Sequence, residues 1–169
     1  MAADLRPKKK QLSYLILEKV CLVNALYHYP TKMTFFSTYE KLELDNIPFI
    51  SNNPKPVKAE ALEYYRLITT SNKLNIKLFE KVNSVETPKE NLHQVNTEKQ
   101  TYTTRNVVVA TGFYDIPNYL NIPGEDLPKV AHYYGDPHYY ATQKTVVVGA
   151  SNSAVDAALE IYRKGGEVS

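Results

Sequence analysis

The sequence predicts an α/β fold, and three kinds of pattern lead to this prediction. The first is a set of short, continuous apolar runs, which are typical of buried parallel strands. The second is a stretch of apolar residues at helical spacing. The third is a pair of alternating segments joined by a turn, which predicts a small antiparallel β-meander. The apolar runs lie at 12–17, 106–110 and 145–148. The helix is expected at 58–71, and the two meander strands at 93–97 and 100–105.

The helix at 58–71 has the clearest local signals. Pro54 and Pro56 precede it, and proline suits the start of a helix because its φ is already helical. Four apolar side chains lie on one face at helical spacing, namely Ala61, Leu62, Tyr65 and Ile68. After this helix, residues 75–85 alternate as a strand would, and residues 88–91 form a polar turn.

The two ends of the chain carry weaker signals. Residues 1–10 read as a short helical stretch weakened by Pro7. Near the other end, residues 153–164 predict a helix that Gly165 and Gly166 terminate, and a new strand begins at Glu167. The proline- and glycine-rich segment 113–143 between them is the best candidate for a domain boundary.

Composition excludes several classes of function. The chain has 169 residues, 43% of them hydrophobic and 22% charged, and a formal net charge of +2. So small a charge does not favour nucleic acid or a membrane surface as a partner, and no apolar run approaches the roughly 18 residues of a membrane helix. The only cysteine, Cys21, permits no internal disulfide, which favours a cytoplasmic protein with an incidental thiol.

The strongest local motif runs from Thr145 to Asp156, with the sequence TVVVGASNSAVD. A strand, a tight turn at Gly149 and a helix follow one another, as a dinucleotide site requires. Ala154 would let the helix pack close to the strand, and backbone amides at the helix start would face a pyrophosphate. Ser151 stands where such motifs carry a second glycine. An ordinary strand–helix turn with Ser153 as N-cap explains the same residues equally well.

Two further signals are weaker. Glu18 ends the run at 12–17, where a Rossmann fold carries an acidic residue for ribose hydroxyls. The strand at 106–110 ends in Thr111-Gly112, small residues that let the backbone approach a cofactor. A surface glutamate after a core strand, and a strand leading into a linker, are the alternatives. The first of the six glycines is Gly112, so no glycine-rich phosphate loop precedes it.

The order of these signals resembles that of the thioredoxin-reductase-like flavoproteins. The aromatic stretch from Asn24 to Thr38, NALYHYPTKMTFFST, together with segments at 40–43, 47–49 and 151–158, is similar to the bacillithiol-disulfide reductase family. The resemblance covers residues 12–169. It implies an incomplete two-dinucleotide-binding, Rossmann-like flavoprotein fold: 1–117 would be a partial FAD-binding domain, and 118–169 the linker and start of an NAD(P)H-binding domain.

The resemblance also implies roles for single residues. FAD would be held by Glu18 at the ribose, by the backbone at Val82 at adenine and by Thr111 and Gly112 at the diphosphate. Asn24 and His28 would lie near the flavin. The phosphates of NADPH would be held by Gly149, Ser151, Asn152, Ser153 and Ala154. No catalytic residue and no metal ligand is assigned.

The implied reaction passes a hydride from NADPH through flavin to a small-molecule disulfide such as bacillithiol disulfide. A flavin monooxygenase-like enzyme and a catalytically incompetent chain are the alternatives. The expected partner is the small-molecule disulfide, and assembly into a homo-oligomer is compatible with the resemblance. Only seventeen residues precede Glu18, too few for the strand, loop and helix of a βαβ unit, which spans about 30 residues. We therefore expect this chain alone to copurify without stoichiometric FAD and to show no NADPH-dependent disulfide reduction.

Overall fold

The computed structural model describes residues 12–112 and 114–169, so the predicted helical stretch at 1–10 lies outside the described residues. Internal contacts divide the chain into two units. Unit 1 takes the described parts of Met1–Tyr27 and Thr34–Asp115, and unit 2 consists of His28–Met33 and Ile116–Ser169. Each unit combines helices with a two-stranded parallel sheet.

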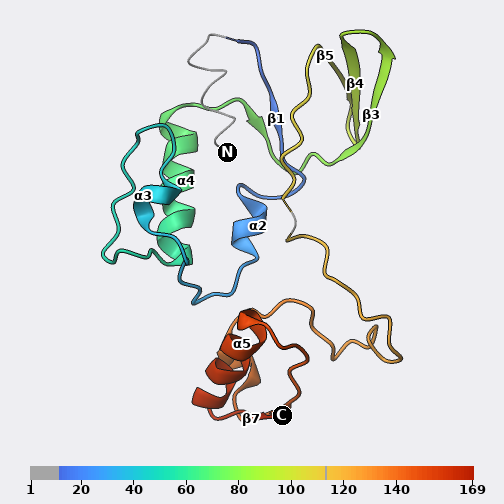
Figure 1. The fold of residues 1–169 in the computed structure, drawn as a ribbon. Coiled ribbons are helices and arrows are strands. Elements are labelled where there is room, and N and C mark those ends of the chain that lie inside the picture. Colours follow the sequence, from blue (N-terminus) through green and yellow to red (C-terminus); the bar gives the residue numbers. More distant parts are fainter. Residues whose placement is uncertain (1–11, 113) are drawn as a thin grey trace. The chain divides into compact units, whose positions relative to one another are not determined.

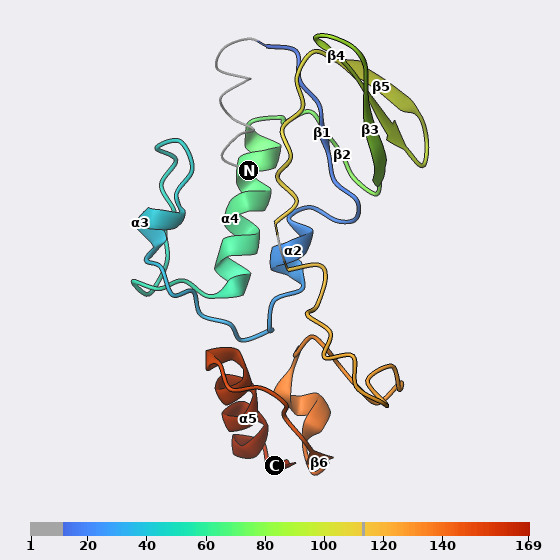
Figure 2. The same ribbon diagram turned by 45° about the vertical axis from the view of Figure 1, so that its right-hand side comes forward.

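Unit 1 contains three helices and five strands among its described residues (Figure 1). Its elements are β1 (Ile16–Leu17), α2 (Asn24–Tyr27), α3 (Tyr39–Leu42), α4 (Lys58–Ser71), β2 (Ile76–Lys77), β3 (Val82–Lys89), β4 (Leu92–Thr97) and β5 (Thr101–Thr104). Strands β1 and β2 pair in parallel, whereas β3, β4 and β5 form an antiparallel meander. The parallel pair lies between α4 and the meander in both Figures 1 and 2.

Helix α4 begins and ends as the sequence predicts. Glu60 stabilises its first turn, because its carboxylate accepts hydrogen bonds from the Val57 amide at 2.9 Å and from the Ser51 hydroxyl at 3.0 Å. The buried face differs slightly from the prediction. Tyr64, rather than Leu62 or Tyr65, joins Ala61 and Ile68 in the core.

A stacked aromatic pair fastens the preceding loop to α4. The rings of Phe49 and Tyr64 lie 4.4 Å apart at an interplanar angle of 7°. The Tyr64 hydroxyl accepts from the Leu44 amide at 2.8 Å and donates to the Ile47 carbonyl at 2.7 Å. This loop and α4 together supply most of the buried hydrophobic side chains of unit 1, namely Phe49, Ala61, Tyr64 and Ile68.

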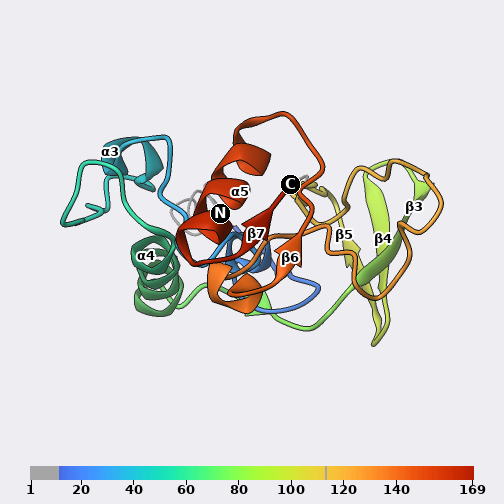
Figure 3. The same ribbon diagram turned by 90° about the horizontal axis from the view of Figure 1, so that it is seen from below.

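Unit 2 contains η1 (Pro137–Tyr140), β6 (Lys144–Thr145), α5 (Asn152–Arg163) and β7 (Glu167–Val168). Strands β6 and β7 pair in parallel, with Lys144 opposite Glu167, and α5 connects them (Figure 3). Helix α5 buries Ala157 and Ile161. Its predicted range is confirmed to within one residue at each end, and the predicted strand at Glu167 is confirmed.

The termination of α5 follows the Schellman pattern. The amide of Gly165, whose φ is +82°, donates to the Tyr162 carbonyl at 2.9 Å. The amide of Gly166 reaches back to the Ile161 carbonyl at 3.0 Å. These two bonds satisfy carbonyls at the end of the helix, and they confirm the predicted glycine stop.

Three of the predicted strands are wrong in extent. The strand at 12–17 shrinks to Ile16–Leu17, and the one at 145–148 to Lys144–Thr145. Residues 106–110, predicted to be a buried strand, form no strand, and Val108 and Val109 are 75% and 77% exposed. A parallel strand inside a sheet needs hydrogen-bonding neighbours on both sides. Within 12–112 and 114–169, no strand pairs with 106–110, and β1 and β6 each have a single partner.

The predicted strand at 75–85 is interrupted. Residues Ile76–Lys77 belong to the parallel pair and β3 begins only at Val82. Between them Phe79 adopts a left-handed conformation with φ of +52°. The alternation of apolar residues continues across this turn. The sequence therefore predicted one strand where the structure has two. The meander strands β4 and β5 are confirmed at their predicted positions.

Candidate functional site

The turn between β6 and α5 has the geometry that close packing of a strand against a helix requires. Gly149 has φ of +149°, a region that residues with a side chain rarely adopt. A Cβ atom at this position would lie 3.0 Å from the Cβ of Ala154, a very tight contact. Both small residues are therefore needed at their positions, as the sequence pattern indicates.

The first turn of α5 offers donors to an anion. Ser151 is the N-cap residue, and its carbonyl accepts from the amides of Ala154 at 3.0 Å and Val155 at 3.2 Å. The amides of Asn152 and Ser153 come before any possible partner within the helix. Ser151, Asn152 and Ser153 are all exposed, and the Ser151 hydroxyl makes no capping hydrogen bond.

This arrangement argues against an ordinary turn capped by Ser153 and is compatible with a dinucleotide-binding turn. Ser153 lies within the helix, so it is not the N-cap of an ordinary turn. Amides and a hydroxyl at the positive end of a helix dipole suit a phosphate group. Gly149, Ser151, Asn152, Ser153 and Ala154 thus all lie in the turn before α5 or at the start of that helix.

A hydrogen bond from the segment before η1 holds α5 in place. The Tyr134 hydroxyl donates to the Glu160 carboxylate at 2.8 Å. Burial of the phenol, and then the neighbouring Glu160 carboxylate, raise the pKa of Tyr134 far above its usual range. This partly buried, charge-assisted hydrogen bond connects α5 to the segment before η1.

In unit 1 the structure brings two of the predicted residues to the same end of the small sheets. The Glu18 amide donates to the Lys77 carbonyl at 2.9 Å, and the Glu18 carbonyl accepts from the Glu80 amide at 3.0 Å. Two residues further on, Val82 opens β3 and pairs with Thr97. Glu18, which is half-buried, and Val82, which is exposed, are thus connected through Glu80.

Glu80 is a site residue that the sequence interpretation missed. Its side chain is buried with 3% exposure, and its Oε1 accepts from the Tyr102 hydroxyl at 2.6 Å and from the Thr97 hydroxyl at 3.0 Å. The hydrogen bond from Tyr102, followed by that from Thr97, lowers the pKa of the Glu80 carboxyl despite its burial. No sequence pattern identifies it, since its partners lie 17 and 22 residues away.

Asn24 and His28 fall in different units. Asn24 opens α2 in unit 1 and is buried, with 3% exposure, and its Oδ1 accepts a hydrogen bond from the Cys21 thiol at 3.4 Å. His28 is exposed and belongs to unit 2. The Cys21 thiol therefore has a local structural contact, and Asn24 supports the turn from which the aromatic stretch leaves.

Thr111 and Gly112 lie in an exposed segment of unit 1. Gly112 has φ of +69°, and a Cβ there would meet no atom within 4 Å. Three residues later the Asp115 carboxylate contacts the Lys19 ammonium group at 2.7 Å. This ion pair attaches the segment that follows Gly112 to the end of β1, next to Glu18.

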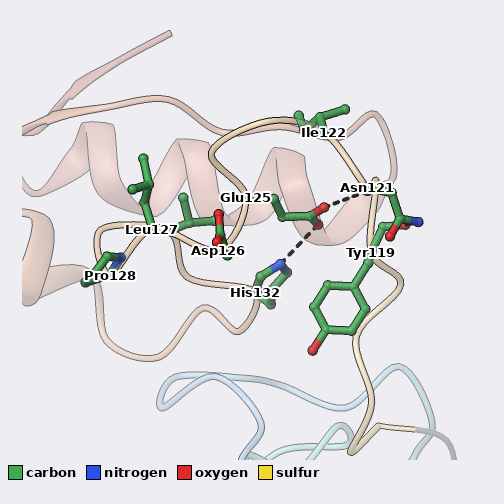
Figure 4. Close-up of a pocket in the computed structure, with 9 residues that line it drawn as sticks. Tyr119, Asn121, Ile122, Glu125, Asp126, Leu127, Pro128 and His132 are labelled. Atoms are coloured by element: carbon green, nitrogen blue, oxygen red, sulfur yellow. Dashed lines mark hydrogen bonds and ion pairs between the residues drawn. The ribbon is translucent and has the colours of Figure 1, made fainter.

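The loop at 119–132 in unit 2 surrounds an open hollow of about 580 Å³ (Figure 4). Glu125 organises this loop, accepting hydrogen bonds from the amides of Leu120 at 2.9 Å and Asn121 at 2.6 Å and lying 3.1 Å from His132 Nε2. These contacts lower the pKa of the Glu125 carboxyl, and the hydrogen bond from the Leu120 amide has the largest effect. The sequence identified this stretch only as a linker, because Glu125 acts through backbone groups that no motif reveals.

No helix within 12–112 and 114–169 combines the length and apolar character needed to cross a bilayer.

Comparisons with known proteins point to one family. The family model described as "Pyridine nucleotide-disulphide oxidoreductase" matches residues 1–169. The bacilliredoxin reductase Bdr of Bacillus subtilis is 44% identical over 168 residues, which cover 99% of this chain and 52% of that protein. The chain therefore spans about half the length of this curated relative.

Solved structures agree with the sequence comparison. The bacillithiol disulfide reductase Bdr from Bacillus cereus superposes with a TM-score of 0.94 at 45% identity, covering 99% of this chain and 53% of that one. A flavin monooxygenase from Stenotrophomonas maltophilia superposes with a TM-score of 0.83 at 22% identity, covering 99% of this chain and 52% of that one, and so shows a shared fold alone. The comparisons favour the reductases over the monooxygenase alternative and confirm the predicted Rossmann-like fold. Since the family model spans the whole chain, the chain belongs to the pyridine nucleotide-disulphide oxidoreductase family.

Proposed function

We propose that the protein carrying this chain is an FAD-dependent oxidoreductase that passes a hydride from NADPH to a low-molecular-weight disulfide such as bacillithiol disulfide. The observation that carries this proposal is the turn at Gly149, whose contact with Ala154 and exposed amides suit a dinucleotide. The similarity to a bacillithiol disulfide reductase at 45% identity supports the choice of substrate class.

Unit 2 would bind the nicotinamide nucleotide. The amides of Asn152 and Ser153 and the hydroxyl of Ser151 would donate to the pyrophosphate, and Gly149 and Ala154 would let it approach the helix. NADPH, when bound, supplies a hydride, which carries both electrons of the reaction. The contribution of this chain is to bind and orient the nucleotide, and the contact between Tyr134 and Glu160 keeps α5 in place for that task.

Unit 1 would bind the adenosine half of FAD. Glu18, half-buried at the end of β1, suits a ribose diol, because a carboxylate accepts hydrogen bonds from two hydroxyls. The backbone at Val82 would meet adenine, and Thr111 and Gly112 would pass near the diphosphate. Asn24 and His28 would lie near the flavin, where we assign them no catalytic step.

The remaining assignments follow from the same proposal. Residues 1–117 would belong to the FAD-binding domain, and residues 118–169 would form the linker and the start of the NAD(P)H-binding domain. A cytoplasmic location agrees with the single thiol at Cys21, since the reaction needs a reducing pool of nucleotide. A homo-oligomer is compatible with this assignment.

A chimaera tests the proposal. In it, this chain replaces the 52% of the Bacillus subtilis reductase to which it aligns. We expect the purified chimaera to contain FAD, to bleach anaerobically with NADPH and to oxidise NADPH when bacillithiol disulfide is added. The chain by itself is the comparison, and we expect it to retain no flavin and to turn over no disulfide, since its first 111 residues contain no glycine.

Three results would count against the proposal. A folded chimaera without flavin would remove the FAD assignment. Flavin reduction by NADPH followed by disulfide-independent consumption of oxygen would favour the monooxygenase reading. Flavin-containing protein that NADPH does not reduce, while the unmodified Bacillus subtilis reductase is reduced in parallel, would remove the role of the turn at Gly149.

A further inference from the structure

The buried carboxylate of Glu80 lies between the two residues that would bind adenosine but is itself shielded from any ligand. Its 3% exposure leaves no surface with which it could touch a nucleotide. A carboxylate is buried only where hydrogen bonds compensate for the loss of water. The Tyr102 hydroxyl is the main donor here, because the Thr97 hydroxyl shares its single proton with the Gln100 carbonyl at 2.8 Å.

The backbone at Glu80 clamps the end of β1. The Glu80 amide donates to the Glu18 carbonyl, and the amide of Phe79 donates to the Val20 carbonyl at 2.9 Å. Phe79 holds a left-handed conformation, with φ of +52°, to make this geometry possible. A strained backbone conformation persists only where the surrounding structure fixes it. For Phe79, the neighbouring residue Glu80 provides this support, because its side chain is held by Tyr102.

The side chain of Glu80 connects this clamp to the meander. Tyr102 lies on β5 and Thr97 on β4, opposite Val82 at the start of β3. The Lys77 ammonium group adds a donor to the Tyr102 hydroxyl at 3.0 Å, from the end of β2. One carboxylate therefore ties the parallel pair β1–β2, which carries Glu18, to the meander, which carries Val82.

We propose that Glu80 is a positioning residue that fixes Glu18 and the backbone at Val82 relative to one another and so sets the affinity of unit 1 for the adenosine half of FAD. This inference rests on the function proposed above. It adds a residue that contacts no cofactor and acts through the Tyr102 hydrogen bond.

The first test uses the full chain without any cofactor. Glu80→Gln keeps the size of the side chain but removes the charge that strengthens the bond from Tyr102. Amide hydrogen exchange at Glu18 and Glu80 should become about tenfold faster, while exchange within α4 stays unchanged. Glu90→Gln is the matched control, since Glu90 is exposed at the tip of the meander and should leave these amides as they are.

The second test uses the chimaera and two ligands. Glu80→Gln should raise the Kd for FAD about tenfold and leave the Kd for NADPH unchanged. A general loss of structure would weaken both. Tyr102→Phe should reproduce the effect on FAD, because it removes the same hydrogen bond.

The outcomes separate this inference from the proposed function. If the unsubstituted chimaera binds no FAD, the proposed function fails and the inference falls with it. If the chimaera binds FAD and Glu80→Gln binds it as tightly as Glu90→Gln does, only the inference is overturned. Equal losses of FAD and NADPH affinity would also overturn it, because they would show a purely structural role.

Discussion

At Gly149, a single hydrogen atom in place of a side chain decides the geometry of a whole turn. The residue combines a φ of +149° with a distance of 3.0 Å between the Cβ that it lacks and the Cβ of Ala154. Glycine is common at turns. At Gly149, the backbone conformation and the lack of space beside Ala154 each disfavour a side chain. At Glu80, likewise, a single residue has a large effect, because its carboxylate connects elements that are distant in the sequence.

Replacement of Gly149 by alanine should be costly. We expect Gly149→Ala to lower the free energy of unfolding by about 1–3 kcal/mol, because the backbone becomes strained and the two Cβ atoms collide. NADPH affinity of the chimaera should fall by about tenfold or more, since the first turn of α5 must shift. Urea denaturation and equilibrium titration measure these effects.

Gly135→Ala is the control for that substitution. A Cβ at Gly135 meets nothing within 4 Å, and its φ lies outside the left-handed region. It should leave both stability and NADPH affinity within experimental error. If the two substitutions behave alike, the turn at Gly149 is not the site of the effect.

Among the secondary-structure elements, α4 owes its position to the loop that precedes it as well as to its own apolar face. The ring of Phe49 stacks on Tyr64, and the Tyr64 hydroxyl is both acceptor and donor to backbone groups of the loop. Satisfying buried backbone groups matters more than the net strength of one hydrogen bond, because an unpaired group loses its water without compensation.

Tyr64→Phe should therefore destabilise unit 1 without disturbing the stack on Phe49. We expect a loss of about 1–3 kcal/mol in the free energy of unfolding, since the Leu44 amide and the Ile47 carbonyl lose their partner. Tyr65→Phe removes one longer bond, 3.2 Å to the Leu42 carbonyl, and should cost less. Chemical denaturation followed by circular dichroism compares the two variants, and an equal cost would refute the role assigned to Tyr64.

Across the molecule, residues predicted to be buried strands lie on the surface. Val108, Val109, Val146 and Val148 are 71–77% exposed. Residues 106–110 have no strand partner among the described residues. Residues 146–148 extend β6 and are paired on one side only, where the Val147 amide donates to the Ser169 carbonyl at 2.9 Å. Extended valine-rich segments of this kind can pair with another chain, because their backbone groups remain available.

The 169-residue chain should accordingly self-associate in solution. Val109→Lys and Val148→Lys should each increase the monomer fraction, because a lysine on such an edge opposes pairing. Val155→Lys is the matched control: this valine is 60% exposed, but it lies on α5, where the helix satisfies the backbone. Sedimentation velocity measures the monomer fraction. An equal gain from Val155→Lys would indicate general solubility and not strand pairing.

Local chemistry in the sequence determined the helix α4 from Lys58 to Ser71, the glycine stop after α5, the strands β4 and β5 and the turn at Gly149. Each depends on residues a few positions apart, so spacing and residue type suffice to predict it. The Asn24–Thr38 stretch likewise indicated the family that the comparisons confirm. The roles of Glu18, Val82 and Gly112 toward a cofactor stay predictions.

The tertiary structure alone decided three other features. It shortened the strands at 12–17 and 145–148 and left 106–110 unpaired, because a parallel strand forms only where neighbours supply its hydrogen bonds. It placed the turn at Phe79 inside a predicted strand. It also buried Glu80 against Tyr102, a contact that spans 22 positions and that no local pattern contains, because only the folded chain brings those two side chains together.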